Sequence, residues 1–322
     1  MYKITLIPGD GIGPEVSAAM QKVVESTGID IEWDLVDSTE PEILIDRIKK
    51  NKIAIKGPIT TPVGKGHRSI NVKLRQELNL YANLRPVKSF KGIKSRYEDI
   101  DLVIVRENTE DLYAGIEHKL GDYGAESIKI ITKGASEKIS EFAFEYAVDN
   151  NRSKVTAVHK ANIMKLTDGL FLNVFRDVAS KYDVEADDVI VDAASMNLVL
   201  TPENYDVMVM PNLYGDILSD LCAGLVGGIG IVPGANIGEE YAVFEAVHGS
   251  ALEIAGKNIA NPTALIQSAV MMLRYIGENE KAGKIESTLE RVFLEGKVLT
   301  ADLGGNASTS EYTDELCRKI KI

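Results

Sequence analysis

The chain has 322 residues and a net charge of −12, with 48 acidic against 36 basic side chains. This balance argues against nucleic acid or an anionic membrane surface as a partner, and no apolar run reaches the length of a membrane span. Two cysteines, no Cys/His cluster and no leader segment argue against a disulfide framework or a zinc site, so we expect a cytoplasmic protein.

Short β-branched runs alternate with amphipathic stretches, which predicts an α/β fold with helices flanking a largely parallel sheet. At this length we expect two domains, woven from one continuous chain. The predicted strands are residues 2–7, 30–36, 52–56, 101–106, 127–132, 154–159, 187–192, 205–210 and 242–247. The predicted helices are residues 14–26, 40–50, 70–79, 135–150, 163–181, 194–199, 213–224, 263–276, 279–293 and 309–320. Residues 114–126 carry glycine and little periodicity, which predicts an excursion between strands or an arm that reaches a second copy of the chain.

The turn after the first predicted strand reads Pro-Gly-Asp-Gly-Ile-Gly-Pro and ends at Pro14. It fails the GxGxxG test for dinucleotide binding, because the third glycine would have to stand at Pro14. Proline suits the first turn of a helix, so we expect a tight strand-to-helix turn that could still line a cleft.

Three arginines, Arg75, Arg85 and Arg106, and one tyrosine, Tyr113, fall within forty residues of this acidic chain. Arginine captures carboxylates through two parallel hydrogen bonds. The group therefore indicates a site for a small polycarboxylate anion.

Lys160 and Asp192 each follow a predicted strand. A lysine placed there could bind an anion or tune a neighbouring acid. A carboxylate at the carboxyl end of a strand lies where α/β proteins bind ligands, although Asp192 could equally cap a helix. Both interpretations stay open.

Asp216 and Asp220 are four residues apart in a predicted helix, so they share one face and repel each other. Two carboxylates at the start of a helix suit Mg²⁺ or Mn²⁺. The alternative is a solvated helical face whose acids are favoured by the helix dipole.

Residues 245–262 form a long loop that contains His248, Gly249, Glu253 and Asn261. Loops of this length inside a compact domain are usually functional. An acid such as Glu253 can accept hydrogen bonds from the ribose hydroxyls of NAD, whereas it would repel the 2′-phosphate of NADP.

Taken in order, these segments resemble the β-decarboxylating dehydrogenases, the family of isocitrate, homoisocitrate and isopropylmalate dehydrogenases, over nearly the whole chain. The resemblance implies a two-domain isopropylmalate/isocitrate dehydrogenase-like fold that is not a Rossmann fold. Residues 1–80 and 228–322 would form a discontinuous large domain, and residues 81–227 a small, dimer-forming domain. It also implies a homodimer in which each active site is completed by the neighbouring chain.

The resemblance assigns a role to each candidate residue. Substrate carboxylates would bind Ser69, Asn71, Arg75, Arg85 and Arg106. Asp216 and Asp220, with Asp192 of the neighbouring chain, would hold Mg²⁺ or Mn²⁺. Tyr113 and the neighbouring chain's Lys160 would form an acid/base pair, with either Lys160 or Asp192 as the hydroxyl base. NAD would bind Thr60, Asn71, His248, Gly249, Glu253, Ile254 and Asn261.

Within the family, two segments are similar to isocitrate dehydrogenases. Ser69, Asn71 and Arg75 form an S-x-N-x-x-x-R pattern, where isopropylmalate enzymes carry a leucine-bearing segment. Residues 106–115 read Arg-Glu-Asn-Thr-Glu-Asp-Leu-Tyr-Ala-Gly. The implied reaction is NAD-dependent oxidative decarboxylation of D-isocitrate to 2-oxoglutarate and CO₂. The alternatives are homoisocitrate, since one methylene gives only about 1–3 kcal/mol of discrimination, isopropylmalate, or a noncatalytic regulatory subunit.

Overall fold

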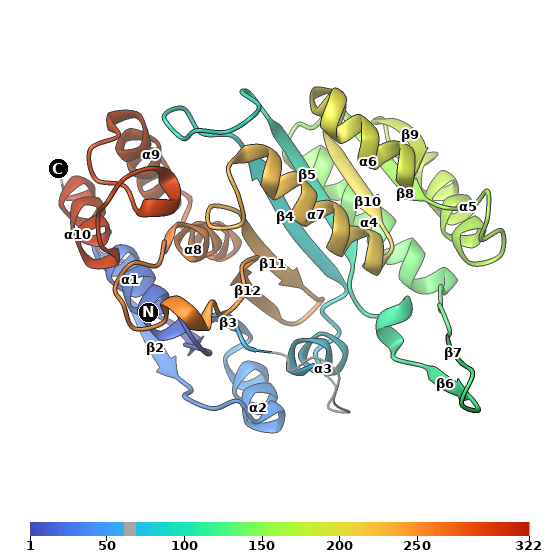
Figure 1. Cartoon of the computed structure of the whole chain (residues 1–322), viewed down its shortest axis with the longest axis horizontal. Helices are drawn as coiled ribbons and strands as arrows, with labels where there is room; N and C mark the ends of the chain where they lie inside the picture. The colour runs from blue at the N-terminus through green and yellow to red at the C-terminus, as the bar shows by residue number, and fades with distance from the viewer. Residues whose placement is uncertain (61–68, 322) are drawn as a thin grey trace.

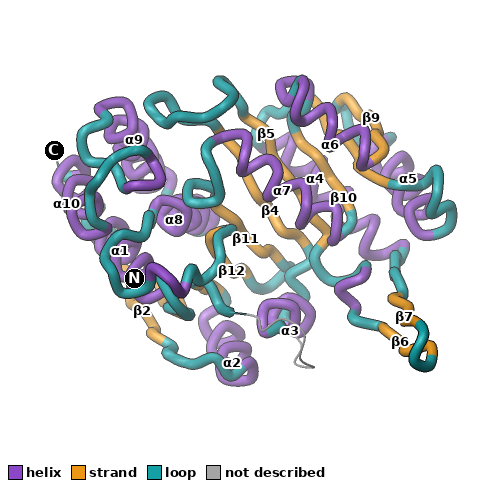
Figure 2. The backbone as a smooth tube through the Cα atoms, in the orientation of Figure 1, coloured by secondary structure: helices purple, strands orange, loops and turns teal. Residues whose placement is uncertain are grey.

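The computed structural model describes residues 1–60 and 69–321. Its centre is a ten-stranded sheet in the order β2-β1-β3-β12-β11-β4-β5-β10-β8-β9, which runs through the whole molecule (Figure 1). Its strands are β1 (Tyr2–Ile7), β2 (Ile31–Leu35), β3 (Ile53–Lys56), β4 (Ala82–Lys88), β5 (Asp101–Glu107), β8 (Lys154–His159), β9 (Glu185–Ile190), β10 (Val207–Met210), β11 (Pro233–Ile237) and β12 (Ala242–Ala246). A separate hairpin, β6 (Glu117–Leu120) and β7 (Gly124–Ser127), extends from one end (Figure 2).

Helices cover both faces of this sheet. In Figure 1, α7 lies in front of the central strands and α4 lies behind them. The α-helices are α1 (Gly13–Glu25), α2 (Pro41–Asn51), α3 (Ile70–Glu77), α4 (Lys133–Asp149), α5 (Thr167–Ala179), α6 (Val191–Leu200), α7 (Asn212–Val226), α8 (Thr263–Tyr275), α9 (Asn279–Glu295) and α10 (Thr309–Ile320). Within the described residues, none of these helices is long and apolar enough to cross a membrane.

Continuous β-branched runs place the inner strands in the core. The side chains of residues 102–105 in β5 and 207–210 in β10 are 0% exposed, as expected of strands covered by helices on both faces. One apolar cluster continues from these strands to α1, α8 and α10.

Two strands in the middle of the sheet escape prediction. β4 contains Pro86 and β11 begins Pro233-Gly234, and such residues usually mark turns or edges. Both strands lie inside the sheet with antiparallel neighbours, β4 between β11 and β5, and β11 between β12 and β4. The remaining pairings are parallel, as expected.

Some predicted bounds are wrong. Residues 128–132 are not a strand, because that run follows the β6–β7 hairpin and makes only an isolated bridge from Ile130 to Asp111. The helix predicted to start at residue 163 starts at Thr167. β9 ends at Ile190, so Asp192 lies in the first turn of α6 and not at a strand end.

The chain crosses between the two halves of the sheet twice. Strands from residues 82–210 make up one half, and strands from residues 2–56 and 233–246 make up the other. The domain division at residues 80 and 228 stays a prediction, although the crossings fall near both positions.

Candidate active site

The three arginines come from three elements and are all buried. Arg75 lies on α3, Arg85 on β4 and Arg106 on β5, with 9%, 7% and 0% of their surfaces exposed. Burial lowers the pKa of Arg85 to about 10, and the charges of Arg106 and Arg75 lower it further. The Nε atoms of Arg75 and Arg85 have no hydrogen-bond partner among the described residues. Such a group of cations favours an anion between them.

Helix α7 holds the guanidinium of Arg106 in place. Asn212 Oδ1 accepts hydrogen bonds from Arg106 Nε at 2.9 Å and Nη2 at 2.7 Å, and Nη1 forms an ion pair with Asp216. The Arg106 side chain lies directly over Gly215, where a Cβ would stand 2.4 Å from Arg106 Cγ. Only glycine permits this close approach of helix and arginine.

Tyr113 and the two aspartates of α7 meet at this arginine. The Tyr113 hydroxyl donates to Asp216 Oδ2 at 2.6 Å, and its ring centroid lies 5.1 Å from the Arg106 guanidinium. Burial, together with the hydrogen bond to Asp216, raises the pKa of Tyr113. Burial opposes ionisation of Asp216, but Arg106, the Tyr113 hydroxyl and Arg85 outweigh it and hold the pKa of Asp216 below its usual range.

Asp220 lies one turn further along α7. Its Oδ1 is 3.5 Å from Arg85 Nη1. Burial and the nearby charge of Asp216 raise the pKa of the Asp220 carboxyl against the attraction of Arg85. The two aspartates therefore share one face of α7, as predicted, and that face points toward the arginines.

Lys160 and Asp192 form a separate pair. Their side chains make an ion pair with each other, and this hydrogen bond lowers the pKa of Asp192. Asp192 is 69% exposed, and neither residue bonds to Tyr113, Asp216 or Asp220 among residues 1–60 and 69–321. Across those residues, no three acidic, histidine or cysteine side chains gather in a way that could hold a metal ion.

The cofactor candidates lie in loops that follow β1, β3 and β12. Gly11, with φ +61°, packs so closely on this loop cluster that a Cβ would stand 2.0 Å from the carbonyl oxygen of Ser250. Thr60 Oγ1 donates to Ser250 Oγ at 2.9 Å, and the Thr60 N–H donates to Asp10 at 2.8 Å. These three loops meet where the parallel strands end, the usual ligand position in α/β sheets.

His248 is buried beside these loops. Its Nδ1 lies 3.1 Å from the carbonyl oxygen of Gly249, and its Nε2 has no hydrogen-bond partner in the described part of the chain. Burial lowers the pKa of His248, so the ring is neutral at pH 7. Asn261 is also buried and donates to Asp302 at 2.9 Å.

Glu253 and Ile254 lie in a short 3₁₀ turn (Leu252–Ile254) of the same loop. Glu253 is exposed, and Ile254 packs partly against the core. Asn71, on α3, has a buried Oδ1 without a partner among the described residues. Ser69 immediately precedes that helix.

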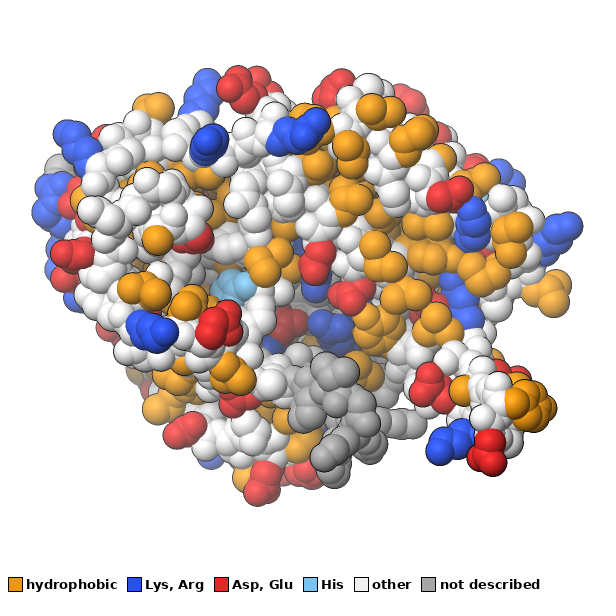
Figure 3. Space-filling model, in the orientation of Figure 1, with side chains coloured by type: hydrophobic (Ala, Val, Ile, Leu, Met, Phe, Trp, Pro, Cys, Tyr) orange, Lys and Arg blue, Asp and Glu red, His pale blue; other side chains and the backbone are white. Residues whose placement is uncertain are grey.

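A hollow opens between the two halves of the molecule, and acidic and basic side chains gather in it (Figure 3). A cavity of about 450 Å³ elsewhere contains none of the predicted site residues, and it is lined by residues of β4, α4 and α8. The convergence of charged groups, not cavity volume, marks the site.

The family model of isocitrate/isopropylmalate dehydrogenases matches residues 3–316. This chain belongs to that family. A Drosophila melanogaster protein named as a probable alpha subunit of mitochondrial NAD isocitrate dehydrogenase is 54% identical, over 99% of this chain and 87% of its own length. A Dictyostelium discoideum protein named as a regulatory subunit of mitochondrial NAD isocitrate dehydrogenase is 54% identical, over 99% and 92%. The crystal structure of isocitrate dehydrogenase from Methylococcus capsulatus has a TM-score of 0.97 and 50% identity, over 100% of both chains.

The predicted fold class is thereby confirmed: this is the α/β fold of the isocitrate/isopropylmalate dehydrogenase family. Within one chain, the structure brings together six of the predicted site residues. They are Arg75, Arg85, Arg106, Tyr113, Asp216 and Asp220. It keeps Lys160 and Asp192 apart from them, as a site shared with a second chain would require.

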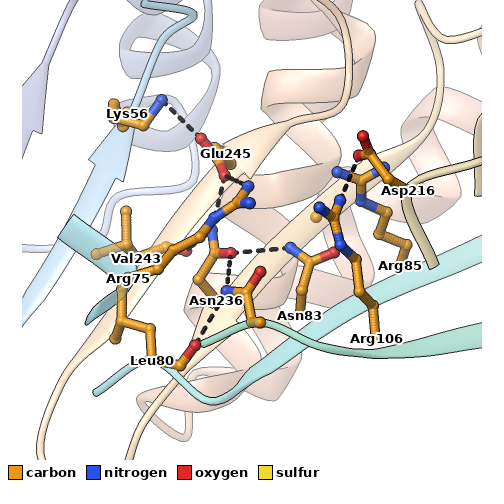
Figure 4. A network of polar contacts seen from close by, with 12 residues as sticks. Lys56, Arg75, Leu80, Asn83, Arg85, Arg106, Asp216, Asn236, Val243 and Glu245 are labelled. Atoms are coloured by element: carbon orange, nitrogen blue, oxygen red, sulfur yellow. Dashed lines mark hydrogen bonds and ion pairs between the residues drawn. The ribbon is translucent and has the colours of Figure 1, made fainter. Parts of the chain in front are cut away.

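Sequence reasoning missed the residues that support the arginines in this family member. Glu245 forms ion pairs with Lys56 at 2.6 Å and Arg75 at 3.4 Å, and it accepts a hydrogen bond from Asn236 at 2.8 Å (Figure 4). Burial opposes its ionisation, but Lys56 and Arg75 hold the pKa of Glu245 far below its usual range. The only signal available was an acid at the end of an apolar run, and nothing in the spacing links it to Lys56.

Proposed function

We propose that this chain catalyses the NAD-dependent oxidative decarboxylation of D-isocitrate to 2-oxoglutarate and CO₂, with Mg²⁺ or Mn²⁺. The observation that carries the proposal is the convergence of three buried arginines with the Tyr113–Asp216 pair on one face of α7. A trianionic substrate matches three arginines. Each charge-assisted hydrogen bond would contribute about 1.5–3 kcal/mol.

The acids of α7 fit a divalent cation. Asp216 and Asp220 offer only oxygen donors, and their side chains are 43% and 64% exposed, so both can reach a ligand. One or two carboxylates plus substrate oxygens are typical of Mg²⁺. When bound, the metal would act as a Lewis acid toward the substrate's hydroxyl and developing enolate oxygen.

The chain's own residues would divide the remaining work. Arg75, Arg85 and Arg106 orient the carboxylates of the substrate. Lys160 or Asp192 of the neighbouring chain removes the hydroxyl proton. Tyr113, whose raised pKa keeps its phenol protonated, delivers a proton to the substrate carbon that loses CO₂.

Gly215→Ala provides a test of the arginine's seat. The new methyl group would push Arg106 away, and overpacking of this kind costs about 1–3 kcal/mol, so the KM for isocitrate should rise about tenfold. Gly224→Ala on the same helix is the matched control, because nothing lies within 4 Å of its Cβ position. Equal KM values for the two variants, measured by NADH formation, would contradict this assignment.

The loops after β1, β3 and β12 fit a nucleotide. The buried, unpartnered Nε2 of His248 and Oδ1 of Asn71 can each take a hydrogen bond, while Thr60, Gly249 and Asn261 lie in or beside these loops. When bound, NAD⁺ would accept hydride from the substrate. Glu253 would favour the free ribose hydroxyls of NAD over the phosphate of NADP.

Replacing Glu253 with lysine and Ile254 with tyrosine should raise kcat/KM for NADP⁺. Removing a repulsive charge and adding an attractive one shifts a phosphate contact by about 1–3 kcal/mol, so the ratio of NADP⁺ to NAD⁺ use should rise at least tenfold. Rates with each coenzyme at saturating isocitrate measure it. An unchanged ratio would mean that this turn does not face the ribose.

A homodimer with shared active sites is the proposed assembly. Exposed apolar side chains gather over α6, α7 and the loop before α5, close to Lys160 and Asp192 (Figure 3). They are Ile163, Leu166, Met196, Val199, Leu200 and Ile217. A patch of this kind marks a protein interface, and the β6–β7 hairpin could reach the same partner. Because two relatives are named as subunits, sedimentation of the purified chain must decide between self-assembly and mixed assembly.

D-isocitrate is proposed over its homologues because Ser69 and Asn71 are polar where an isopropyl group would need apolar contacts. Rates with isocitrate, homoisocitrate, isopropylmalate and tartrate, each with NAD⁺ and NADP⁺, test this choice. Isocitrate should give the highest kcat/KM, and no turnover of isocitrate would overturn it. The cytoplasmic location stays a prediction, since both relatives are named as mitochondrial.

A further inference from the structure

A buried charge cluster lies beside the site and is not explained by the function proposed above. Lys129 Nζ lies 2.7 Å from Asp168 Oδ1, 3.7 Å from Asp111 Oδ1 and 4.3 Å from the ring centroid of Tyr214. Both aspartates are 0% exposed. We call these four residues the Lys129 cluster.

One arm of the cluster leads to Tyr113 and Asp216. Asp111 stands two residues before Tyr113, in a left-handed conformation with φ +71°. Its Oδ2 accepts the N–H of Leu213 at 2.9 Å, in the first turn of α7. Asp216 follows within one turn, so Asp111 ties the tyrosine segment to the helix that carries Asp216.

The other arm leads to Lys160. Asp168 Oδ2 accepts the backbone N–H of Lys160 at 2.7 Å and the hydroxyl of Tyr214 at 3.0 Å. Burial and the charge of Asp168 raise the pKa of Tyr214, so its hydroxyl remains a donor. Asp168 therefore fixes the start of the loop from which the Lys160 side chain projects.

Lys129 is the cation shared by both arms. Without it, two fully buried carboxylates would lack a counter-charge, and buried charges without partners force the surrounding backbone to rearrange or the groups to take up protons. Either response would move Asp111 and Asp168 together.

We propose that Lys129 is a positioning residue that couples the two active sites of the dimer. The proposal rests on the proposed function, in which Tyr113 and Asp216 serve their own chain's site while Lys160 serves the neighbouring chain's site. One buried cluster would then hold parts of two different sites.

The test uses mixed dimers with a single intact site. One chain carries Tyr113→Phe and the other Lys160→Met, and the two are separated from homodimers by different affinity tags. Each homodimer should be nearly inactive, whereas the mixed dimer should regain activity from Tyr113 of the second chain and Lys160 of the first. If it regains none, site sharing is wrong and the coupling falls with it.

Lys129→Met is then added to either chain of the active mixed dimer. In the first chain it can act only through Lys160, and in the second only through Tyr113 and Asp216. Because small misplacements of catalytic groups cost about 10–100-fold, we expect kcat to fall at least tenfold in both arrangements. A loss in only one arrangement, or in neither, would overturn the coupling while leaving the proposed function intact.

Two further variants separate positioning from folding. Lys319→Met removes a lysine of similar burial, 9% against 11% exposed, that pairs with Glu295 at 2.7 Å on the far side of the molecule. It should lower thermal stability without lowering kcat in either chain. Lys129→Arg keeps the cation and should restore most of the activity. A folded Lys129→Arg dimer as slow as Lys129→Met, or an equal kcat loss in Lys319→Met, would also overturn the proposal.

Discussion

Replacing Arg106 with methionine is expected to lower kcat/KM for isocitrate by about two to three orders of magnitude, since breaking a buried charge pair costs about 3–5 kcal/mol. Arg106 is 0% exposed and joins Asn212, Asp216 and the ring of Tyr113. Its loss would remove a contact to the substrate and leave Asp216 without its nearest cation. Steady-state NADH formation measures the effect.

Two variants show whether the loss belongs to the site. Arg106→Lys keeps the charge but not the planar fork that Asn212 holds, so most of the loss should remain. Arg152→Met breaks comparable ion pairs with Asp101 and Asp206 away from the site, and it should change stability but not kcat/KM. Near-normal kcat/KM in folded Arg106→Met would remove Arg106 from the substrate site.

Tyr113→Phe is expected to reduce kcat by about 10²–10⁴-fold, the usual contribution of a general acid. The KM for isocitrate should change little, because the three arginines that bind the carboxylates stay in place. The aromatic ring also remains beside Arg106, so the variant removes only the hydroxyl that donates to Asp216.

The pattern of kcat against KM is the informative readout for this variant. Tyr146→Phe removes the hydroxyl of another partly buried tyrosine, on α4 behind the sheet, and should leave both constants unchanged. A Tyr113→Phe enzyme that loses affinity but keeps kcat would show that the hydroxyl binds substrate and does not deliver the proton.

Local sequence predicted the outer strands and most helices because their apolar periodicity agrees with their burial. It failed at β4 and β11, where Pro86 and Pro233 stand inside the sheet. Proline removes a ladder donor and is rarely found there. These strands are stabilised by antiparallel pairing with distant segments, which no local pattern reveals.

The site was predictable where residue type alone limits the chemistry. Clustered arginines indicated a polycarboxylate, and two acids one turn apart on α7 indicated a cation. The supporting residues were not predictable, because Asn212, Glu245 and Lys129 act through contacts with residues far away in sequence. Buried polar groups of this kind are recognisable only once their partners are known.

The central claim is that this chain is itself a catalyst and not solely a regulatory subunit. The direct test is to give the purified chain alone D-isocitrate, NAD⁺ and Mn²⁺, and to measure NADH, 2-oxoglutarate and CO₂ together. The account predicts equal amounts of the three products, little turnover with NADP⁺, and loss of activity when the metal is chelated. No turnover by a folded chain that still binds isocitrate would contradict it.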